Sequence, residues 1–393
     1  MLIVSVDRFI HISGKYYCKP YSLLSLSQYW DVFPEVKLLG HEITGNIIPD
    51  GWLVIPEDIV FYPINGIDNL NPIIRKKIRN EIWDFIKEEK IAYLRMPDFR
   101  VLEIYKFIKN KIPYFCEFHG DWEESLLAQK LNTVDLKNKI KGFLANYRAK
   151  IAGQYYREIG ENALVNISIG PRLIEKYNLD VKPSLATANH IIKKETIIVR
   201  DNYDLNKEVL SLLFVGELQH RKGLDYLIQA LAKLKKDSNY KFSLSIVGIG
   251  YLDKELDAMV AAKGLKNDIH FKGAIYDRDT LEKEYKKANV FVLPSIAGEG
   301  VPRVLQEAQA FGCAIIATDI GSTYWQLQND SGILIKSNSV QSLIDAIMTM
   351  YDDERRKELS LNATKNAYEF TYEKQKDDIA KFIHMHLKEY IHD

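Results

Sequence analysis

Glu299 and Glu307 lie eight residues apart, and their surroundings predict where each carboxylate points. Residues 289–295 are apolar and partly β-branched, and a glycine-rich turn follows them, which is typical of a buried strand. Pro302 suits the first position of a helix and Gly312 suits its end. We therefore expect Glu299 in the loop after a strand and Glu307 inside the following helix.

A loop in this place could bind an anion. Ligands of open α/β sheets bind at the carboxyl ends of the strands. The amides of Gly300 and Val301, together with the positive end of the helix dipole, favour negative charge, and a sugar diphosphate would fit. The alternative is that Glu299 only helps to satisfy first-turn amides and that Glu307 is a solvated helix residue.

A second strand-to-helix turn follows the same plan in residues 211–234. An apolar strand ends at Gly216, and an amphipathic helix begins after Gly223. Lys222, with Arg221 beside it, would stand in the turn, where a cation can reach a diphosphate and Gly223 lets the backbone approach closely. A Lys-Gly pair at a helix start is, by itself, usually only a solvated charge.

Together these motifs resemble the retaining, nucleotide-sugar-dependent glycosyltransferases of the GT-B fold that carry a Glu-x7-Glu signature. The resemblance covers about residues 205 to 340, and its Glu-Gly-Val-Pro-Arg form is similar to the subgroup that builds capsular, exopolysaccharide or lipid-linked glycans. It rests on five motifs in order: Gly216, Leu218, Lys222 and Gly223; Val247, Gly248 and Gly250; Phe271 and Gly273; Glu299 and Glu307; and Ala308, Gly312, Thr318, Asp319 and Gly321.

The resemblance implies a role for each candidate residue of the second half. Glu307 would bind the ribose hydroxyls, Glu299 the sugar hydroxyls, and Lys222 the charge on the departing diphosphate. The base would be held by backbone near Ala274 and Ile275. Attack from the same face of the sugar would retain its configuration, without a metal ion, a cofactor or a covalent nucleophile.

Two candidates lie in the first half. His119 ends the apolar strand at residues 113–118, and the resemblance implies that it faces the donor sugar; a lone histidine at a strand end is more often structural. Gly14 would let the loop after the first strand approach the diphosphate.

Three departures from the family pattern stand out. Glu217 occupies the place where many relatives have an arginine, so that Arg221 or another cation must compensate or diphosphate binding is weaker. Tyr324 and Trp325 stand where an acidic residue is common. The first loop has only Gly14 in place of paired glycines.

Length and pattern predict two α/β domains. The 393 residues exceed what one core usually supports, and strands alternate with helices on both sides of a polar break near 190–208. The resemblance implies two facing Rossmann-like domains with a central cleft. We expect residues 1–195 to form an acceptor-side domain, residues 205–371 to form the nucleotide-sugar domain, and a C-terminal helix within 372–393 to cross back to the first.

Composition narrows the partners and the location. The 53 basic and 53 acidic residues argue against nucleic acid. Cys18, Cys116 and Cys313 show no paired spacing, and no long apolar run or signal-like start is present, which predicts a cytoplasmic protein. The basic stretch 137–157 is either an amphipathic surface for the inner face of a membrane or a core-facing helix with a solvated basic side.

The sequence therefore predicts a retaining glycosyltransferase. It would move a sugar from a nucleoside diphosphate to a hydroxyl of a glycan or a lipid-linked acceptor, in surface polysaccharide biosynthesis. Two alternatives stay open: a nucleotide-sugar epimerase or hydrolase of the same architecture, and a non-catalytic nucleotide-sugar-binding protein, which the position of Glu217 would favour.

Overall fold

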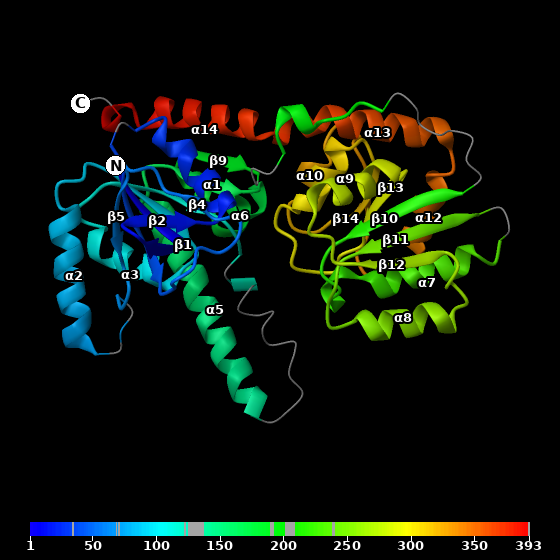
Figure 1. The fold of residues 1–393 in the computed structure, drawn as a ribbon, viewed down its shortest axis with the longest axis horizontal. Helices are drawn as coiled ribbons and strands as arrows, with labels where there is room; N and C mark the ends of the chain where they lie inside the picture. The colour runs from blue at the N-terminus through cyan, green and yellow to red at the C-terminus, as the bar shows by residue number, and fades with distance from the viewer. Residues whose placement is uncertain are drawn as a thin grey trace. The chain divides into compact units, whose positions relative to one another are not determined.

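The computed structural model divides the chain into two compact units, Met1–His190 with Gln375–Asp393, and Ile191–Lys374 (Figure 1). These limits differ by a few residues from the expected 1–195, 205–371 and 372–393. The structure describes residues 1–33, 35–67, 69, 71–121, 123–124, 137–188, 192–200, 209–237 and 240–391.

The first unit contains a nine-stranded sheet. Its parallel strands follow the spatial order β5-β3-β1-β6-β7-β8-β9, which is the order 3-2-1-4-5-6-7 along the chain and belongs to doubly wound α/β folds. The order reverses between β1 and β6. The strands are β1 (Leu2–Ile12), β2 (Lys15–Cys18), β3 (Lys37–Ile43), β4 (Leu53–Val54), β5 (Val60–Pro63), β6 (Ala92–Met96), β7 (Tyr114–Phe118), β8 (Asn166–Ile169) and β9 (Ser184–Thr187).

Two further strands of this sheet form antiparallel pairs. β2 pairs antiparallel with β1, and β4 pairs antiparallel with β2. Ser13 and Gly14 both have positive φ, 53° and 80°, which suits a two-residue hairpin turn and returns the chain along β1. Gly14 therefore lies in the hairpin turn that follows the first strand. Its contact with a diphosphate stays a prediction.

The helices of the first unit are α1 (Pro20–Trp30), α2 (Pro72–Ile86), α3 (Phe99–Ile108), α5 (Lys137–Asn162) and α6 (Pro171–Tyr177), and part of α14 (Tyr372–His386) belongs to it as well. One side of the C-terminal segment is buried in the same core as Ile3 and Phe115; it presents Ile379, Ile383, Leu387 and Ile391. The C-terminal residues thus complete the core of the first unit.

Helix α5 contains the basic stretch 137–157. The side chains of residues 137–145 lie outside the described part of the structure. Beyond them, Ala152 and Tyr156 are buried, while Arg148 and Lys150 are exposed. This part of α5 is a core-facing helix with an exposed basic side, as the second interpretation expects. No helix among the described residues is long and apolar enough to cross a membrane.

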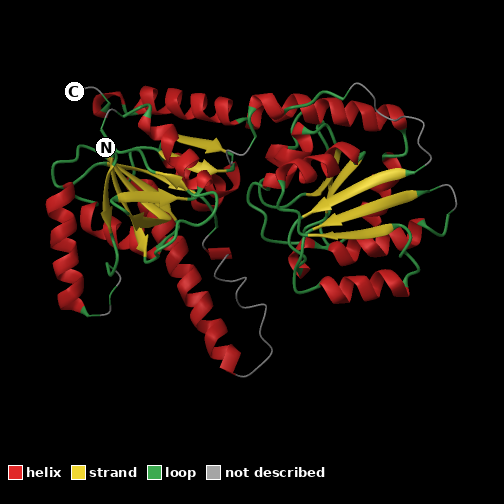
Figure 2. Ribbon diagram, in the orientation of Figure 1, coloured by secondary structure: helices red, strands yellow, loops and turns green. Residues whose placement is uncertain are grey.

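The second unit contains a six-stranded parallel sheet in the order β12-β11-β10-β13-β14-β15, which is 3-2-1-4-5-6 along the chain. Figure 2 shows helices on both sides of this sheet. The strands are β10 (Leu210–Val215), β11 (Phe242–Val247), β12 (Ile269–Gly273), β13 (Val290–Leu293), β14 (Ala314–Thr318) and β15 (Ile333–Ile335). The helices are α7 (Leu224–Leu234), α8 (Asp253–Ala262), α9 (Arg278–Lys287), α10 (Arg303–Ala310), α11 (Thr323–Gln326), α12 (Val340–Thr349) and α13 (Asp353–Ala367).

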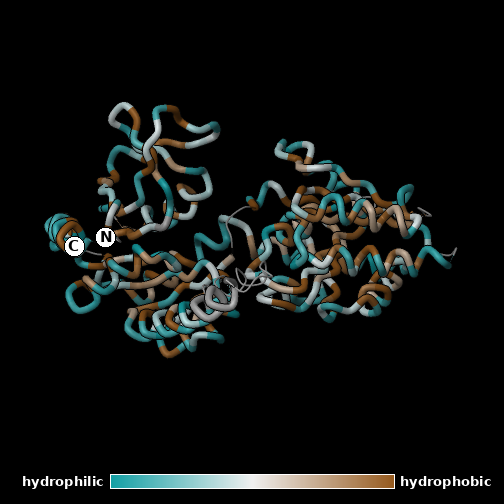
Figure 3. The backbone as a smooth tube through the Cα atoms, turned by 90° about the horizontal axis from the view of Figure 1, so that it is seen from below, coloured by the Kyte–Doolittle hydropathy of each residue, from teal (hydrophilic) through white to brown (hydrophobic). Residues whose placement is uncertain are grey.

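Amphipathic helices cover this sheet, and in Figure 3 they alternate between hydrophobic and hydrophilic residues as they turn. The apolar side of α7 is buried as its spacing predicts, through Leu224, Leu227, Ile228, Leu231 and Leu234. The strand order reverses between β10 and β13. Ligands of doubly wound sheets bind at the carboxyl ends of the strands beside such a reversal.

Candidate active site

The loops after β10 and β13 border the reversal point of the second sheet, and their backbones touch. Gly223 has φ +65°, and a Cβ there would lie 2.1 Å from the carbonyl oxygen of Pro294. The amide of Ile296 donates a hydrogen bond of 2.8 Å to the carbonyl of Arg221. Only glycine allows this approach, so the loop that holds Lys222 is set against the loop that leads to Glu299.

A third loop, after β14, supports Glu299 from its other side. Gly321 has φ +58°, and a Cβ there would lie 1.7 Å from the carbonyl oxygen of Glu299. The amide of Ser322 donates to the carbonyl of Gly300 at 3.0 Å. Thr318 Oγ1 donates to the carbonyl of Ser295 at 2.5 Å. The Thr-Asp-x-Gly turn thus fixes the backbone on which Glu299 stands.

Lys222 and Glu299, 77 positions apart in the chain, form an ion pair where these loops meet. Their side chains are only 10% and 7% exposed. Ser295 Oγ donates to Glu299 Oε1 at 2.6 Å, and Arg221 Nη1 lies 3.7 Å from the same oxygen. Among the described residues every hydrogen bond and ion pair of this carboxylate falls on Oε1, so Oε2 is available to accept from a ligand hydroxyl.

The turn around Lys222 also positions the other residues proposed for the diphosphate. A Cβ at Gly216 would lie 3.9 Å from Cε of Lys222, so the lysine stem passes beside this glycine. Arg221 Nη1 donates to the carbonyl of Gly298 at 3.2 Å, which holds a second cation where these loops meet. Glu217 is exposed at the surface of the unit. Compensation by Arg221 for the missing arginine stays a prediction.

Helix α10 begins at Arg303, so Pro302 precedes the helix and is not its first residue, which is a small correction. Proline can occupy either position because its amide hydrogen is not needed there. Gly300 is exposed and Val301 is buried, and both lie just before the helix. Binding of an anion at their amides stays a prediction.

Glu307, the fifth residue of α10, is held by two donors from α9 that the sequence had not indicated. Arg278 Nη1 donates to Oε1 at 2.6 Å, and Tyr285 Oη donates to Oε2 at 2.7 Å. Burial and the charge of Glu307 raise the pKa of Tyr285 well above its usual value, so the phenol remains a donor. Arg278 and Tyr285 are two helical turns apart and so lie on one face of α9. This spacing was the only feature of the sequence that could have indicated that they act together. Glu307 is not simply a solvated helix residue.

Ala274 and Ile275 lie in the loop between β12 and α9, after Gly273 with φ +68°. This loop leads within three residues to Arg278, which binds Glu307. Ala274 and Ile275, expected to hold the base, thus lie just before the start of α9. The first residue of that helix contacts Glu307, which is expected to hold the ribose. Contact with a base stays a prediction.

His119 lies at the carboxyl end of β7, in a cluster of buried charges. Arg95 Nε lies 2.9 Å from His119 Nε2, and Glu117 Oε1 lies 3.2 Å from the same nitrogen. Arg95 also donates to Asp7, which accepts a hydrogen bond of 2.6 Å from Ser22. Sequence reasoning found only the histidine of this cluster. The strands β1, β6 and β7 bring it together beside the reversal point of the first sheet.

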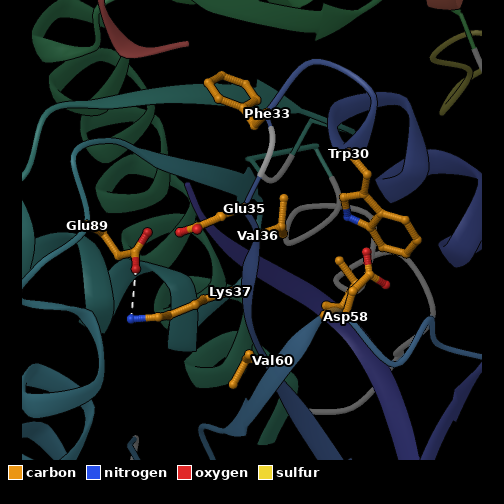
Figure 4. A pocket seen from close by; sticks show the side chains of 9 residues that line it. Trp30, Phe33, Glu35, Val36, Lys37, Asp58, Val60 and Glu89 are labelled. Carbon is orange, nitrogen blue, oxygen red and sulfur yellow. Dashed lines mark ion pairs between the residues drawn. The ribbon is translucent and has the colours of Figure 1, made fainter. Parts of the chain in front are cut away.

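A cavity of about 350 Å³ in the first unit lies away from this cluster. Its lining includes Lys37 and Val60, the first residues of β3 and β5, so it opens at the amino ends of the parallel strands. Figure 4 shows the ion pair of 2.9 Å between Lys37 and Glu89 among the lining side chains. The cavity therefore lies at the opposite edge of the sheet from His119, away from the candidate active-site residues.

Metal-ligand groups give no further candidate. Among the described residues, no three or more His, Cys, Asp or Glu side chains are grouped so that they could hold a metal ion. Cys18, Cys116 and Cys313 are free and buried, and burial raises the pKa of each thiol.

Comparison with known families identifies the region that contains Lys222, Glu299 and Glu307. The model of the family Glycosyl transferases group 1 matches residues 196–370. The matched residues are similar to that family and make up less than half of the chain.

Curated proteins with glycosyltransferase names are similar to part of this chain. An uncharacterized glycosyltransferase of Methanocaldococcus jannaschii is 30% identical over 190 residues, which is 48% of this chain and 47% of the relative. A Campylobacter jejuni protein is 30% identical over 175 residues, 44% of this chain and 47% of that protein; it is the GalNAc-alpha-(1->4)-GalNAc-alpha-(1->3)-diNAcBac-PP-undecaprenol alpha-1,4-N-acetyl-D-galactosaminyltransferase. The chain thus spans about half the length of the curated relatives it matches.

Solved structures extend the likeness in fold to both units. Anabaena HepE in complex with UDP superposes with a TM-score of 0.68 at 16% identity, over 98% of this chain and 100% of that one. Two Rossmann-like units of this kind make the GT-B fold, which confirms the predicted fold class.

Proposed function

We propose that this protein is a retaining glycosyltransferase that moves a sugar from a nucleoside diphosphate to an acceptor hydroxyl. The observation that carries the proposal is the ion pair of Lys222 and Glu299 at the reversal point of the second sheet, with Arg221 beside it. A cation that is nearly buried interacts with a diphosphate more strongly than one in water. The match to a glycosyltransferase family over these residues supports the same reading.

Each residue has a distinct task in the proposed reaction. Lys222 and Arg221 balance the charge that grows on the diphosphate as the sugar leaves. Glu299 Oε2 accepts from hydroxyls of the sugar, while Oε1 stays bound to Lys222 and Ser295. Glu307 accepts from the ribose hydroxyls, and Tyr285 holds its carboxylate in place. His119 faces the sugar from the first unit. The proposed reaction needs neither metal nor cofactor.

The relatives suggest the kind of substrates. HepE binds UDP, and the Campylobacter jejuni protein has a name that describes transfer to a diphospho-undecaprenol glycan. We propose a nucleotide-sugar donor and a glycan or lipid-linked acceptor for this chain, in surface polysaccharide biosynthesis. Transfer to a lipid-linked acceptor would take place in the cytoplasm at the inner face of the membrane. The exposed basic side of α5 is the candidate for contact with that membrane.

The proposal is tested by incubating the purified protein with a panel of UDP-, GDP- and dTDP-sugars, with and without lipid-linked acceptors. Nucleoside diphosphate should form only when an acceptor is present, and the product should keep the anomeric configuration of the donor. Free sugar or an epimer from donor alone would instead identify a hydrolase or an epimerase. Binding of the donor without any product would identify a binding protein.

A matched pair of variants separates the site from the fold. Glu307→Gln should abolish or strongly reduce transfer. Glu358→Gln should not, although Glu358 also lies on a helix of the second unit and also accepts a 2.6 Å hydrogen bond from an arginine. Equal activity of the two variants would refute the role of Glu307.

A further inference from the structure

The carboxylate of Glu117 is fully buried in the first unit, yet only one of its oxygens is satisfied. Tyr29 Oη donates to Oε2 at 3.0 Å, and Tyr93 Oη donates to the same oxygen. Oε1 has no hydrogen-bond donor assigned to it. Its polar neighbour is Nε2 of His119, at 3.2 Å. A buried carboxylate oxygen without a donor is unfavourable, so this position calls for a hydrogen on Nε2.

Nε2 of His119 lies between two groups with opposite requirements. Arg95 Nε–H, at 2.9 Å, needs an acceptor, whereas Glu117 Oε1 needs a donor. A neutral ring with its hydrogen on Nδ1 would satisfy Arg95 and leave Oε1 unpaired. A ring with hydrogen on Nε2 satisfies Oε1, while Arg95 keeps its hydrogen bond to Asp7 and has its Nη2 3.4 Å from Nδ1. Each arrangement leaves one of the two groups at Nε2 without a partner, Oε1 in the first and Arg95 Nε–H in the second. Only the second also gives Nη2 of Arg95 an acceptor, at Nδ1, while Asp7 still meets the charge of the guanidinium.

Glu117 cannot supply this hydrogen itself. Burial opposes its charge, but His119, Arg95 and the hydrogen bond from Tyr93 more than offset the burial and lower the pKa of Glu117 to about 2. At neutral pH the group is therefore a carboxylate, which only accepts hydrogen bonds. The charged and titratable groups around the ring come from β1, β6, β7 and α1, namely Asp7, Arg95, Tyr93, Glu117 and Tyr29.

We propose that Glu117 is a positioning residue for His119: its buried carboxylate receives the hydrogen of Nε2 and holds the imidazole at the carboxyl end of β7. The His119 side chain is 21% exposed, so part of the ring can reach a ligand. The inference depends on the proposed function only because that function supplies the substrate that His119 would contact. The pairing itself is a property of the first unit.

The glutamine variant reverses this hydrogen bond. In Glu117→Gln, the hydroxyls of Tyr29 and Tyr93 keep the amide oxygen at the Oε2 position, because both donate there. The NH₂ group then faces Nε2, which must become an acceptor, and the ring hydrogen moves to Nδ1. Glutamine has nearly the same shape as glutamate, yet at this position it imposes the opposite tautomer on His119.

The ring tautomer is measured by NMR of protein labelled with ¹⁵N in its histidine rings, with His119→Asn to assign the signal. At pH 7 the wild-type protein should carry hydrogen on Nε2 of His119, and the fraction with that hydrogen should fall at least about tenfold in Glu117→Gln. Tyr29→Phe removes a contact of Oε2 only and should leave the signal unchanged. Absence of hydrogen from Nε2 in the wild-type protein would overturn the proposal, even if the glutamine variant failed to fold.

Transfer kinetics separate this inference from the proposed function. Glu117→Gln should lower kcat at least about tenfold with little change in KM for the donor, and should add no further loss in the His119→Asn background. A wild-type kcat in Glu117→Gln would overturn the positioning role while the glycosyltransferase proposal stands. The expected tautomer change in a protein that transfers no sugar would refute the proposed function and support the pairing.

Discussion

Replacing Lys222 by methionine should destabilise the second unit as well as impair transfer. The variant keeps most of the side-chain volume but leaves the carboxylate of Glu299 nearly buried without its main counter-charge. Breaking a buried ion pair costs about 3–5 kcal/mol. Ser295 still donates to this carboxylate, and Arg221, at 3.7 Å and 37% exposed, recovers about 1 kcal/mol at most. We expect a net loss of about 2–4 kcal/mol.

The double variant Lys222→Met/Glu299→Gln identifies the cause of this loss. It removes both charges, so it should be more stable than Lys222→Met alone by about 1–3 kcal/mol, although transfer stays lost. Hydrogen exchange followed by mass spectrometry is the suitable assay, because peptides from β13 and α10 report on the second unit by itself.

The matched control is Lys235, whose ion pair with Asp268 at 2.5 Å lies in the same unit but is 42% and 25% exposed. Lys235→Met should cost about 1 kcal/mol or less, because water screens the pair. If Lys222→Met cost no more than this control, or if the losses of the double variant were simply additive, the ion pair would not hold these loops together.

Four further outcomes are expected. Glu307→Ala should weaken nucleotide binding by about 1.5–3 kcal/mol for each lost hydrogen bond, measured by calorimetry against Glu358→Ala. Gly321→Ala should reduce protection of the second unit more than Gly264→Ala, because both glycines have positive φ but only the first would place a Cβ 1.7 Å from a carbonyl oxygen. Glu117 has a lowered pKa of about 2, so it should add stability above about pH 4.5 that is lost as pH falls toward 2, and Glu117→Gln should abolish this dependence in acid unfolding curves. Transfer should survive chelation by EDTA, and rescue of a chelated enzyme by Mg²⁺ or Mn²⁺ would show that a metal takes part.

Local patterns were sufficient to predict the elements that carry the second site. The apolar strands, the glycine turns and the amphipathic helix α7 all depend on residues close together in the chain. Parallel strands then place the loops of Lys222 and Glu299 at one edge of the sheet. The ion pair between them could not be predicted, because it depends on β10 and β13 being neighbours in the sheet, a long-range property of the fold.

The missed residues share a physical reason. Arg95 and Glu117 lie within strands that are otherwise apolar. A charged residue in such a strand is usually interpreted as one that faces solvent, so neither residue was expected to be buried. Both are buried because β1, β6 and β7 lie side by side and supply partners from different parts of the chain. The loop at Gly14 was predicted but its hairpin form was not, although Ser-Gly suits a two-residue turn.

The same strand order produces different chemistry in the two units. In both, the order reverses beside the first strand, and polar groups gather at the carboxyl ends there. The second unit uses glycines to bring three loops into backbone contact, so that its charged side chains project from turns. The first unit keeps its charges on the strands themselves, where Asp7, Arg95 and Glu117 are buried against one another. Because a strand side chain has little freedom to move, the network can set the tautomer of His119.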